Sequence, residues 1–215
     1  MSPFAKKMPF PFSELHAAIV LLIFHFVGIV GILSKYSSFF VALTPMNLLL
    51  SMFILLAFHP KYDSRFWIFS IVTILSGIGV EWIGVHTGWL FGSYSYSGVF
   101  GWRLDGIPVL IGLNWLMLTI ISGEVLHLII KNKALKIIAS AALMVFIDYL
   151  IEPVAVKYNF WQWHTGFIPW TNYATWFAVS IPLQFLYSWS RRGNNPLAKW
   201  LILVQILFFI ALQIK

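Results

Sequence analysis

The sequence predicts an all-α, polytopic integral membrane protein, a helical bundle with about seven transmembrane helices. The 215 residues are 60% hydrophobic and 10% charged, and the mean hydropathy is +0.85. A soluble domain of this length cannot bury so much apolar surface. The apolar residues form continuous runs of about 20, the length that a helix needs to cross the hydrocarbon core. A membrane β-barrel would show alternating segments of about 10 residues, so strands are not expected.

The apolar runs place the helices along the chain. With boundaries accurate to about 2–4 residues, the expected helices span residues 15–33, 41–59, 66–86, 107–130, 134–154, 173–190 and 198–214. No soluble domain or internal repeat is left between them, so residues 1–215 are expected to form one transmembrane domain. The basic start "MSPFAKKMPFPFSELH" precedes an apolar run without a small-residue cleavage site, so no cleavable signal peptide is expected.

The distribution of Lys and Arg predicts the orientation. Ten of these 14 residues fall on one set of ends and loops, namely Lys6, Lys7, Lys61, Arg65, Lys131, Lys133, Lys136, Arg191, Arg192 and Lys199. Positive charge favours the cytoplasmic side. We therefore expect a cytoplasmic N-terminus and an outer C-terminus in the cell (cytoplasmic or inner) membrane, as an odd helix count requires.

Charge and cysteine content exclude several classes of function. The net charge is +7, but the basic residues are scattered between apolar runs and form no single patch, so no nucleic-acid partner is expected. The chain has no cysteine, which excludes a disulfide framework, a thiolate nucleophile and a Cys-based metal site. The expected partner is the lipid bilayer. The two long outer connections, "TGWLFGSYSYSGVFGWRLDGIP" (87–108) and "KYNFWQWHTGFIPWTN" (157–172), are dense in Gly, Trp and Tyr, and an interfacial aromatic belt explains only part of this crowding.

Several polar residues fall at one depth in the membrane. With a rise of about 1.5 Å per residue, Glu81 and Asp148 lie about 22 and 21 Å from the cytoplasmic starts of their helices. Asn114 and Asn47 lie about 9–10 Å below the outer face, in nearly the same layer of a core about 30 Å thick. Glu152 lies one turn above Asp148 on the same helix face. Ionisable groups inside a membrane are costly and usually functional.

A second acidic position lies nearer the cytoplasmic side. Glu124 and His127 have the Glu-x-x-His spacing of di-iron bundles. Such a site needs two of these motifs and further carboxylates at the same depth, which are missing here. No metal is expected, and an ion pair between Glu124 and Lys131 is the simpler interpretation.

Clustered carboxyls beside aromatic rings suggest acid catalysis on a hydrocarbon. In a low-dielectric site such carboxyls cannot all ionise, so one is expected to remain a neutral proton donor near neutral pH. It could protonate an electron-rich alkene, while Trp and Tyr faces stabilise the carbocation. A second, ionised carboxylate could orient a water molecule and accept its proton. The product is a tertiary alcohol, formed without cofactor or metal.

Three blocks of sequence resemble a known membrane family. They are "GVEWIGVHTGWLFGSYSY" (79–96), "GIPVLIGLNWL" (106–116) and "DYLIEPVAVKYNFWQWHTGFIPWTNYATW" (148–176), which together cover about residues 75–180. Their patterns are similar to those of the carotenoid-biosynthesis membrane family that includes the CruF-type carotenoid 1,2-hydratases.

The resemblance implies hydration of the terminal double bond of an acyclic (ψ) carotenoid end, such as that of γ-carotene, lycopene or bisanhydrobacterioruberin. It implies a lipophilic carotenoid substrate and no cofactor. Glu81, Asp148 and Glu152 are the expected catalytic residues, with either Glu81 or Asp148 as the acid and the other holding the water. The expected substrate-binding residues are Asn114, Trp115, Tyr94, Tyr96, Trp161, Trp163 and Asn172. The oligomeric state is left open.

Two alternatives remain open at the level of sequence. The buried acids could be structural in a non-catalytic carotenoid-binding protein, since polar networks hold membrane helices together. The spacing of Asp148 and Glu152 could also hold magnesium and diphosphate in a membrane prenyltransferase. That chemistry needs a second acidic motif and several nearby bases, whereas Lys157 is the only base close by.

Overall fold

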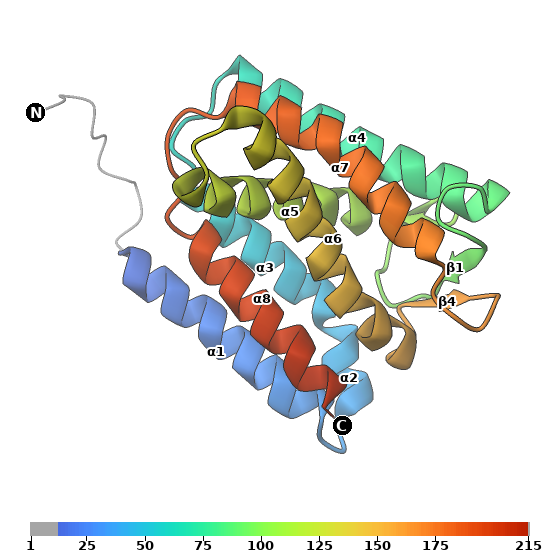
Figure 1. The fold of residues 1–215 in the computed structure, drawn as a ribbon. Coiled ribbons are helices and arrows are strands. Elements are labelled where there is room, and N and C mark those ends of the chain that lie inside the picture. The colour runs from blue at the N-terminus through green and yellow to red at the C-terminus, as the bar shows by residue number, and fades with distance from the viewer. Residues whose placement is uncertain (1–12, 215) are drawn as a thin grey trace, which may run out of the picture.

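Apolar runs long enough to span a bilayer fold into helices because only internal hydrogen bonding satisfies the backbone there. The computed structural model describes residues 13–214, in which eight helices pack as a bundle (Figure 1). They are α1 (Glu14–Ile32), α2 (Ser37–Ala42), α3 (Thr44–Ala57), α4 (Ser64–Thr87), α5 (Val109–Ile129), α6 (Lys133–Lys157), α7 (Trp170–Ser190) and α8 (Ala198–Gln213). By length and composition α1, α4, α5 and α6 can cross a membrane, and α3 and α8 are shorter apolar helices. The predicted all-α polytopic membrane bundle is confirmed.

Each predicted helical segment corresponds to a helix, except that the second is divided in two. Residues 41–59 were expected to form one helix, but α2 ends before Leu43 and α3 begins directly after it. Pro45 occupies the first turn of α3, where a missing backbone N–H carries no cost. The proline therefore favours a new helix start at this position.

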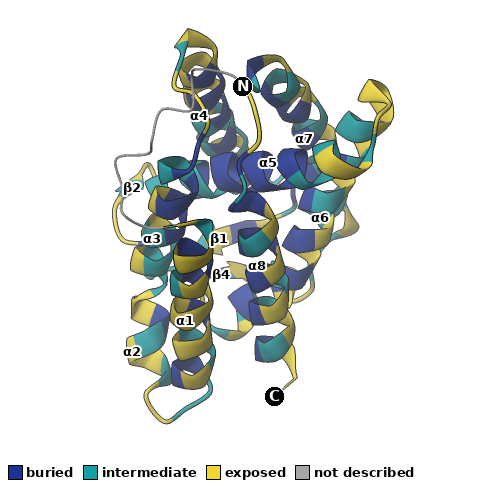
Figure 2. Ribbon diagram, turned by 90° about the vertical axis from the view of Figure 1, so that its left-hand side faces the viewer, coloured by how far each residue is buried: buried dark blue, intermediate teal, exposed yellow. Residues whose placement is uncertain are grey.

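Helix α5 forms the centre of the bundle. It packs against α3, α4, α6, α7 and α8, and its ribbon is mostly dark blue in Figure 2. In the most apolar 18-residue stretch of α5, 67% of the residues are buried, whereas the corresponding share is 33% in each of α1, α4 and α6. A helix that is apolar on all sides is expected at such a central position.

One end of the bundle gathers basic residues predicted to be cytoplasmic. Arg192 Nε lies 3.1 Å from Asp63 Oδ2 at the start of α4, and Lys199 Nζ lies 2.9 Å from Glu14 Oε1 at the start of α1. These contacts bring the starts of α1, α4 and α8 and the end of α7 to the same side, as alternating spans require. Two further basic residues of that prediction, Lys6 and Lys7, lie outside the described residues.

Short strands join the loops at the opposite end. β1 (Tyr94–Tyr96) pairs antiparallel with β4 (Trp161–Trp163), and β2 (Arg103–Leu104) pairs with β3 (Ile107–Pro108). Figure 1 shows β1 and β4 beside the ends of α4, α6 and α7. These strands were not predicted, because segments of two or three residues are too short for a detectable alternation. The β1–β4 ribbon links the two aromatic connections, which lie far apart in the sequence.

Candidate active site

The carboxyl of Glu81 on α4 is buried and accepts three hydrogen bonds. Its Oε2 accepts the hydroxyls of Tyr94 at 2.5 Å and Tyr96 at 2.7 Å, and its Oε1 accepts the indole N–H of Trp115 at 3.1 Å. Only 4% of Glu81 is exposed. Because all three donors are neutral, they stabilise the carboxylate without supplying a countercharge.

Glycines on α4 make room for two of these donors. Gly77 and Gly84 lie one turn before and one turn after Glu81, on the same face of the helix. A Cβ at Gly77 would lie 2.8 Å from the ring of Trp115, and one at Gly84 would lie 3.0 Å from the hydroxyl of Tyr94. Side chains at these two positions would therefore displace the groups that bind the carboxyl.

Asp148 and Glu152, one turn apart on α6, share a donor from α7. The Asn172 side-chain N–H group lies 2.9 Å from Asp148 Oδ2 and 3.1 Å from Glu152 Oε1. Glu152 Oε2 accepts the indole N–H groups of Trp161 at 3.1 Å and Trp163 at 2.8 Å. Both carboxyls are 2% exposed. Asn172 thus joins the two acids, and the tryptophan-rich loop closes over the second.

The β1–β4 ribbon forms an aromatic lid over the acids. Tyr94 is paired with Trp163 and Tyr96 with Trp161, and these four rings lie on one face of the ribbon, whereas the middle residue of each strand is exposed. The alternation of a strand produces this arrangement. Burial raises the pKa of the Tyr94 and Tyr96 hydroxyls above their usual range, and the nearby Glu81 carboxyl raises it further. The phenols therefore stay protonated and act as donors.

A small pocket lies beneath the lid. Its volume is about 30 Å³, and Glu81, Asp148 and Glu152 line it together with Asn114 and Trp176. A cavity of this size holds about one water molecule when polar groups surround it. No Lys or Arg lines the pocket, and no ion pair in residues 13–214 involves its three acids. This acid pocket therefore contains carboxyls from two helices and no countercharge.

A larger apolar cavity adjoins the acid pocket. It has a volume of about 480 Å³ and shares Ile111, Asn114, Ile151 and Trp161 with the acid pocket. Asn47, which was predicted to lie in the same layer as the acids, lines this larger cavity instead. The estimated depth correctly grouped Asn114 with the acids. It could not show which way Asn47 faces, because depth along a helix does not give the rotation of α3 about its axis.

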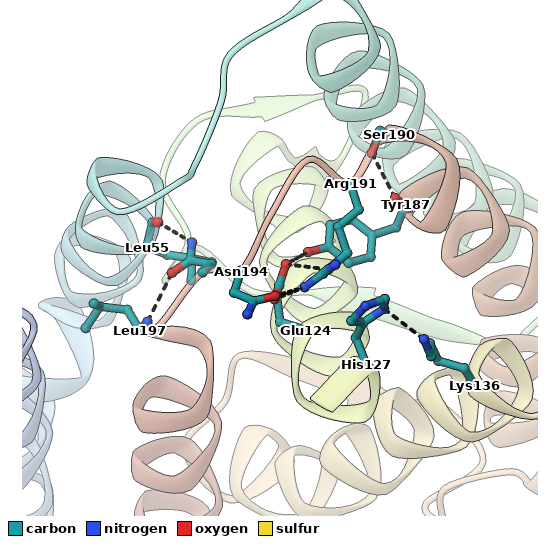
Figure 3. Close-up of polar contacts among 10 residues, drawn as sticks. Leu55, Glu124, His127, Lys136, Tyr187, Ser190, Arg191, Asn194 and Leu197 are labelled. Atoms are coloured by element: carbon teal, nitrogen blue, oxygen red, sulfur yellow. Dashed lines mark hydrogen bonds and ion pairs between the residues drawn. The ribbon is translucent and has the colours of Figure 1, made fainter. Parts of the chain in front are cut away.

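Glu124 belongs to a separate cluster, shown in Figure 3. Its Oε1 accepts the Tyr187 hydroxyl at 2.5 Å and Arg191 Nε at 3.0 Å, and its Oε2 accepts Arg191 Nη2 at 3.2 Å. The predicted ion pair with Lys131 is wrong. The long arm of Arg191, at the end of α7, reaches the buried carboxyl and forms a two-pronged contact.

His127 contacts a lysine, and the described part of the chain contains no metal-binding cluster. Lys136 Nζ lies 2.9 Å from His127 Nδ1 (Figure 3). Within residues 13–214, no three His, Asp or Glu side chains form a group suited to a metal ion.

Trp176 was not among the predicted site residues. Its ring stacks on that of Trp115 with centroids 3.7 Å apart and an interplanar angle of 7°, and it lines the acid pocket. It lies four residues after Asn172 and therefore on the same face of α7. That spacing was the signal in the sequence that could have identified it.

These observations define a polytopic membrane protein with a buried acid pocket next to an apolar cavity. The sequence profile of the family described as "Carotenoid biosynthesis protein" matches residues 42–214, well over half of the chain. The chain therefore belongs to the carotenoid biosynthesis protein family, and the resemblance found in the sequence motifs is confirmed at this level. The matched range contains the three motif blocks and extends beyond them on both sides.

A curated relative has a more specific name. The chain is 25% identical over 193 residues to a bisanhydrobacterioruberin hydratase from Haloarcula japonica. The alignment covers 81% of this chain and 66% of that protein, which is just under two thirds of its length. No solved structure matches this chain significantly.

Proposed function

We propose that this protein is a carotenoid hydratase that adds water to the terminal double bond of an acyclic (ψ) carotenoid end group. The observation that carries the proposal is the water-sized pocket in which Glu81, Asp148 and Glu152 meet without a countercharge, next to a large apolar cavity. Membership of the family and the name of the relative support the same substrate class.

Asp148 is our candidate for the proton donor. The carboxyls of Glu81 and Glu152 each accept three hydrogen bonds, whereas Asp148 accepts one, from Asn172, among the described residues. Hydrogen bonds to a carboxylate favour its charged form. Three like charges cannot share a buried pocket without a countercharge, so the proton belongs on the acid that has the fewest donors.

The reaction follows from these roles. The Asp148 hydroxyl transfers its proton to the less substituted carbon of the terminal alkene, leaving a tertiary cation on the neighbouring carbon. A water molecule held at Glu81 forms a C–O bond to that carbon, and its surplus proton passes to the Glu81 carboxylate. Return of this proton to Asp148 completes a net addition of one water without redox change.

Aromatic rings beside the acids stabilise the cation. Trp176 lines the acid pocket and stacks on Trp115, and Trp161 lies between the acid pocket and the apolar cavity. The face of an indole attracts a positive charge by about 2 kcal/mol or more in a desolvated site. A cation formed at the junction of the two cavities therefore contacts rings as well as the ionised acid.

The direct test is turnover by purified protein. Protein in lipid nanodiscs is incubated with lycopene or γ-carotene, and the products are analysed by mass spectrometry. We expect an alcohol that is heavier than the substrate by one water molecule and that forms without added metal or cofactor. The absence of such a product with every ψ-end carotenoid tested would reject the hydratase and favour a carotenoid-binding role.

A further inference from the structure

The apolar cavity has the size and position of a chamber for an apolar chain whose end reaches the acids. Helices α1, α3, α5, α6 and α8 contribute its walls, and its volume of about 480 Å³ lies in the range of sites for small molecules. It joins the acid pocket at Asn114 and Trp161. An apolar chain lying in it would therefore end next to the carboxyls.

The rim of the cavity faces the surroundings of the bundle. Phe24 and Val27 on α1 and Met46 on α3 line the cavity, yet they are 51%, 48% and 66% exposed. Exposed apolar side chains on membrane helices face lipid. The cavity thus reaches the bilayer between α1 and α3, on a side of the molecule where Figure 2 shows much exposed surface along α1.

Three buried polar atoms in the cavity wall lack a partner. Asn47 Oδ1 and Ser51 Oγ on α3 and Gln205 Oε1 on α8 have no hydrogen bond among the described residues. Ser51 and Gln205 are only 2% and 7% exposed. Leaving such atoms unsatisfied in an apolar site is costly. Two of them are amide oxygens, which only accept hydrogen bonds, so the complementary ligand group is a hydrogen-bond donor, which in a hydroxylated polyene is an O–H.

We propose that this chamber binds the terminal isoprenoid segment of the polyene, which enters from the bilayer between α1 and α3, and that one of the three polar atoms accepts the O–H of the alcohol as the product end withdraws from the acid pocket. The inference rests on the proposed function for the identity of the chain. In that reaction the end enters as a hydrocarbon and leaves as a tertiary alcohol. The chamber therefore accommodates both, and its polar atoms bind the hydroxylated form.

Blocking the chamber tests this inference. A Cβ at Gly28 would lie 3.2 Å from the ring of Phe208 in the chamber wall, so Gly28→Leu fills the chamber from α1, and Ser51→Leu fills it from α3. Gly79→Leu is the control, because a Cβ at this position on α4 meets nothing within 4 Å. Binding of lycopene in nanodiscs is measured by quenching of tryptophan fluorescence, after gel filtration has selected folded protein.

We expect the Kd for lycopene to rise at least tenfold in Gly28→Leu and in Ser51→Leu, and to stay within twofold of wild type in Gly79→Leu. Equal affinities in all folded variants would overturn the chamber. Because the readout is binding, wild-type protein that binds lycopene in the chamber but forms no alcohol would reject the hydratase alone.

A second comparison tests the O–H contact. Gln205→Met keeps the length of the side chain but removes its amide oxygen. Loss of one hydrogen bond of about 0.5–1.5 kcal/mol weakens binding about 2–13-fold. We expect this loss for the tertiary alcohol derived from lycopene and not for lycopene itself. Equal shifts for both ligands would show that the Gln205 amide oxygen does not bind the hydroxyl, and would overturn this part of the inference.

Discussion

Neutral donors, rather than cations, surround the three buried carboxyls. Two phenols and one indole bind Glu81, two indoles and an amide bind Glu152, and the same amide binds Asp148. Within this distribution Asn172 links two of the acids, because its side-chain amide donates to both Asp148 and Glu152. The same distribution gives the two indoles of the lid a role in holding Glu152, in addition to the role in substrate binding that was predicted.

Replacing Asn172 by Leu should therefore destabilise the protein. The substitution keeps the approximate shape of the side chain but leaves both Asp148 and Glu152 without this donor. We expect the free energy of unfolding in detergent to fall by about 1–3 kcal/mol. Ser95→Ala, at an exposed position of the lid, is the control. Equal stability of the two variants would show that the shared amide does not matter.

Close packing of α4 against its neighbours depends on small residues. Gly77 lies against Trp115 on α5, and a Cβ at Gly112 on α5 would lie 2.9 Å from the Ile74 carbonyl oxygen on α4. Small residues permit such approach of membrane helices. The two helices thus fix the distance between Glu81 and its indole donor.

Gly77→Ala should lower activity without removing any reactive group. The added methyl displaces the Trp115 ring, and a misplacement of about 1 Å can cost about 10²-fold in rate. We expect at least a tenfold loss of carotenoid hydration. Gly79→Ala, which meets open space, should retain the wild-type rate. Similar rates in both variants would mean that the Trp115 contact has no catalytic importance.

The sequence predicted the helices better than the contacts between them. Apolar runs are local, so all seven helical regions were found, but the pairing of β1 with β4 joins loops that are remote in the chain. Depth along a helix identified Glu81 and Asp148, whereas rotation about the axis could not be predicted for Asn47. Likewise, local spacing predicted an ion pair between Glu124 and Lys131. The residue that pairs with Glu124 is Arg191, which lies 67 residues away in the sequence.

The two ends of the bundle carry different kinds of side chain. Arg191, Arg192 and Lys199 make ion pairs at one end, and the aromatic lid and acid pocket lie toward the other. If the basic end is cytoplasmic, the lid faces outward.

Labelling of single cysteines tests this orientation, because the natural chain has none. Lys61 and Thr165 are exposed in loops at opposite ends. With a membrane-impermeant maleimide on intact cells, we expect Thr165→Cys to react and Lys61→Cys to react only after permeabilisation. The reverse pattern would show that the lid faces the cytoplasm.

Comparison of Asp148→Asn with wild type is the most direct test of proton donation by a buried carboxyl. The amide keeps the size of the side chain but lacks a transferable acidic proton, and loss of a general acid costs about 10²–10⁴-fold. Lycopene binding and alcohol formation are measured on the same nanodisc samples. We predict unchanged lycopene affinity with at least a hundredfold lower rate of hydration. Hydration by Asp148→Asn at the wild-type rate would contradict this mechanism.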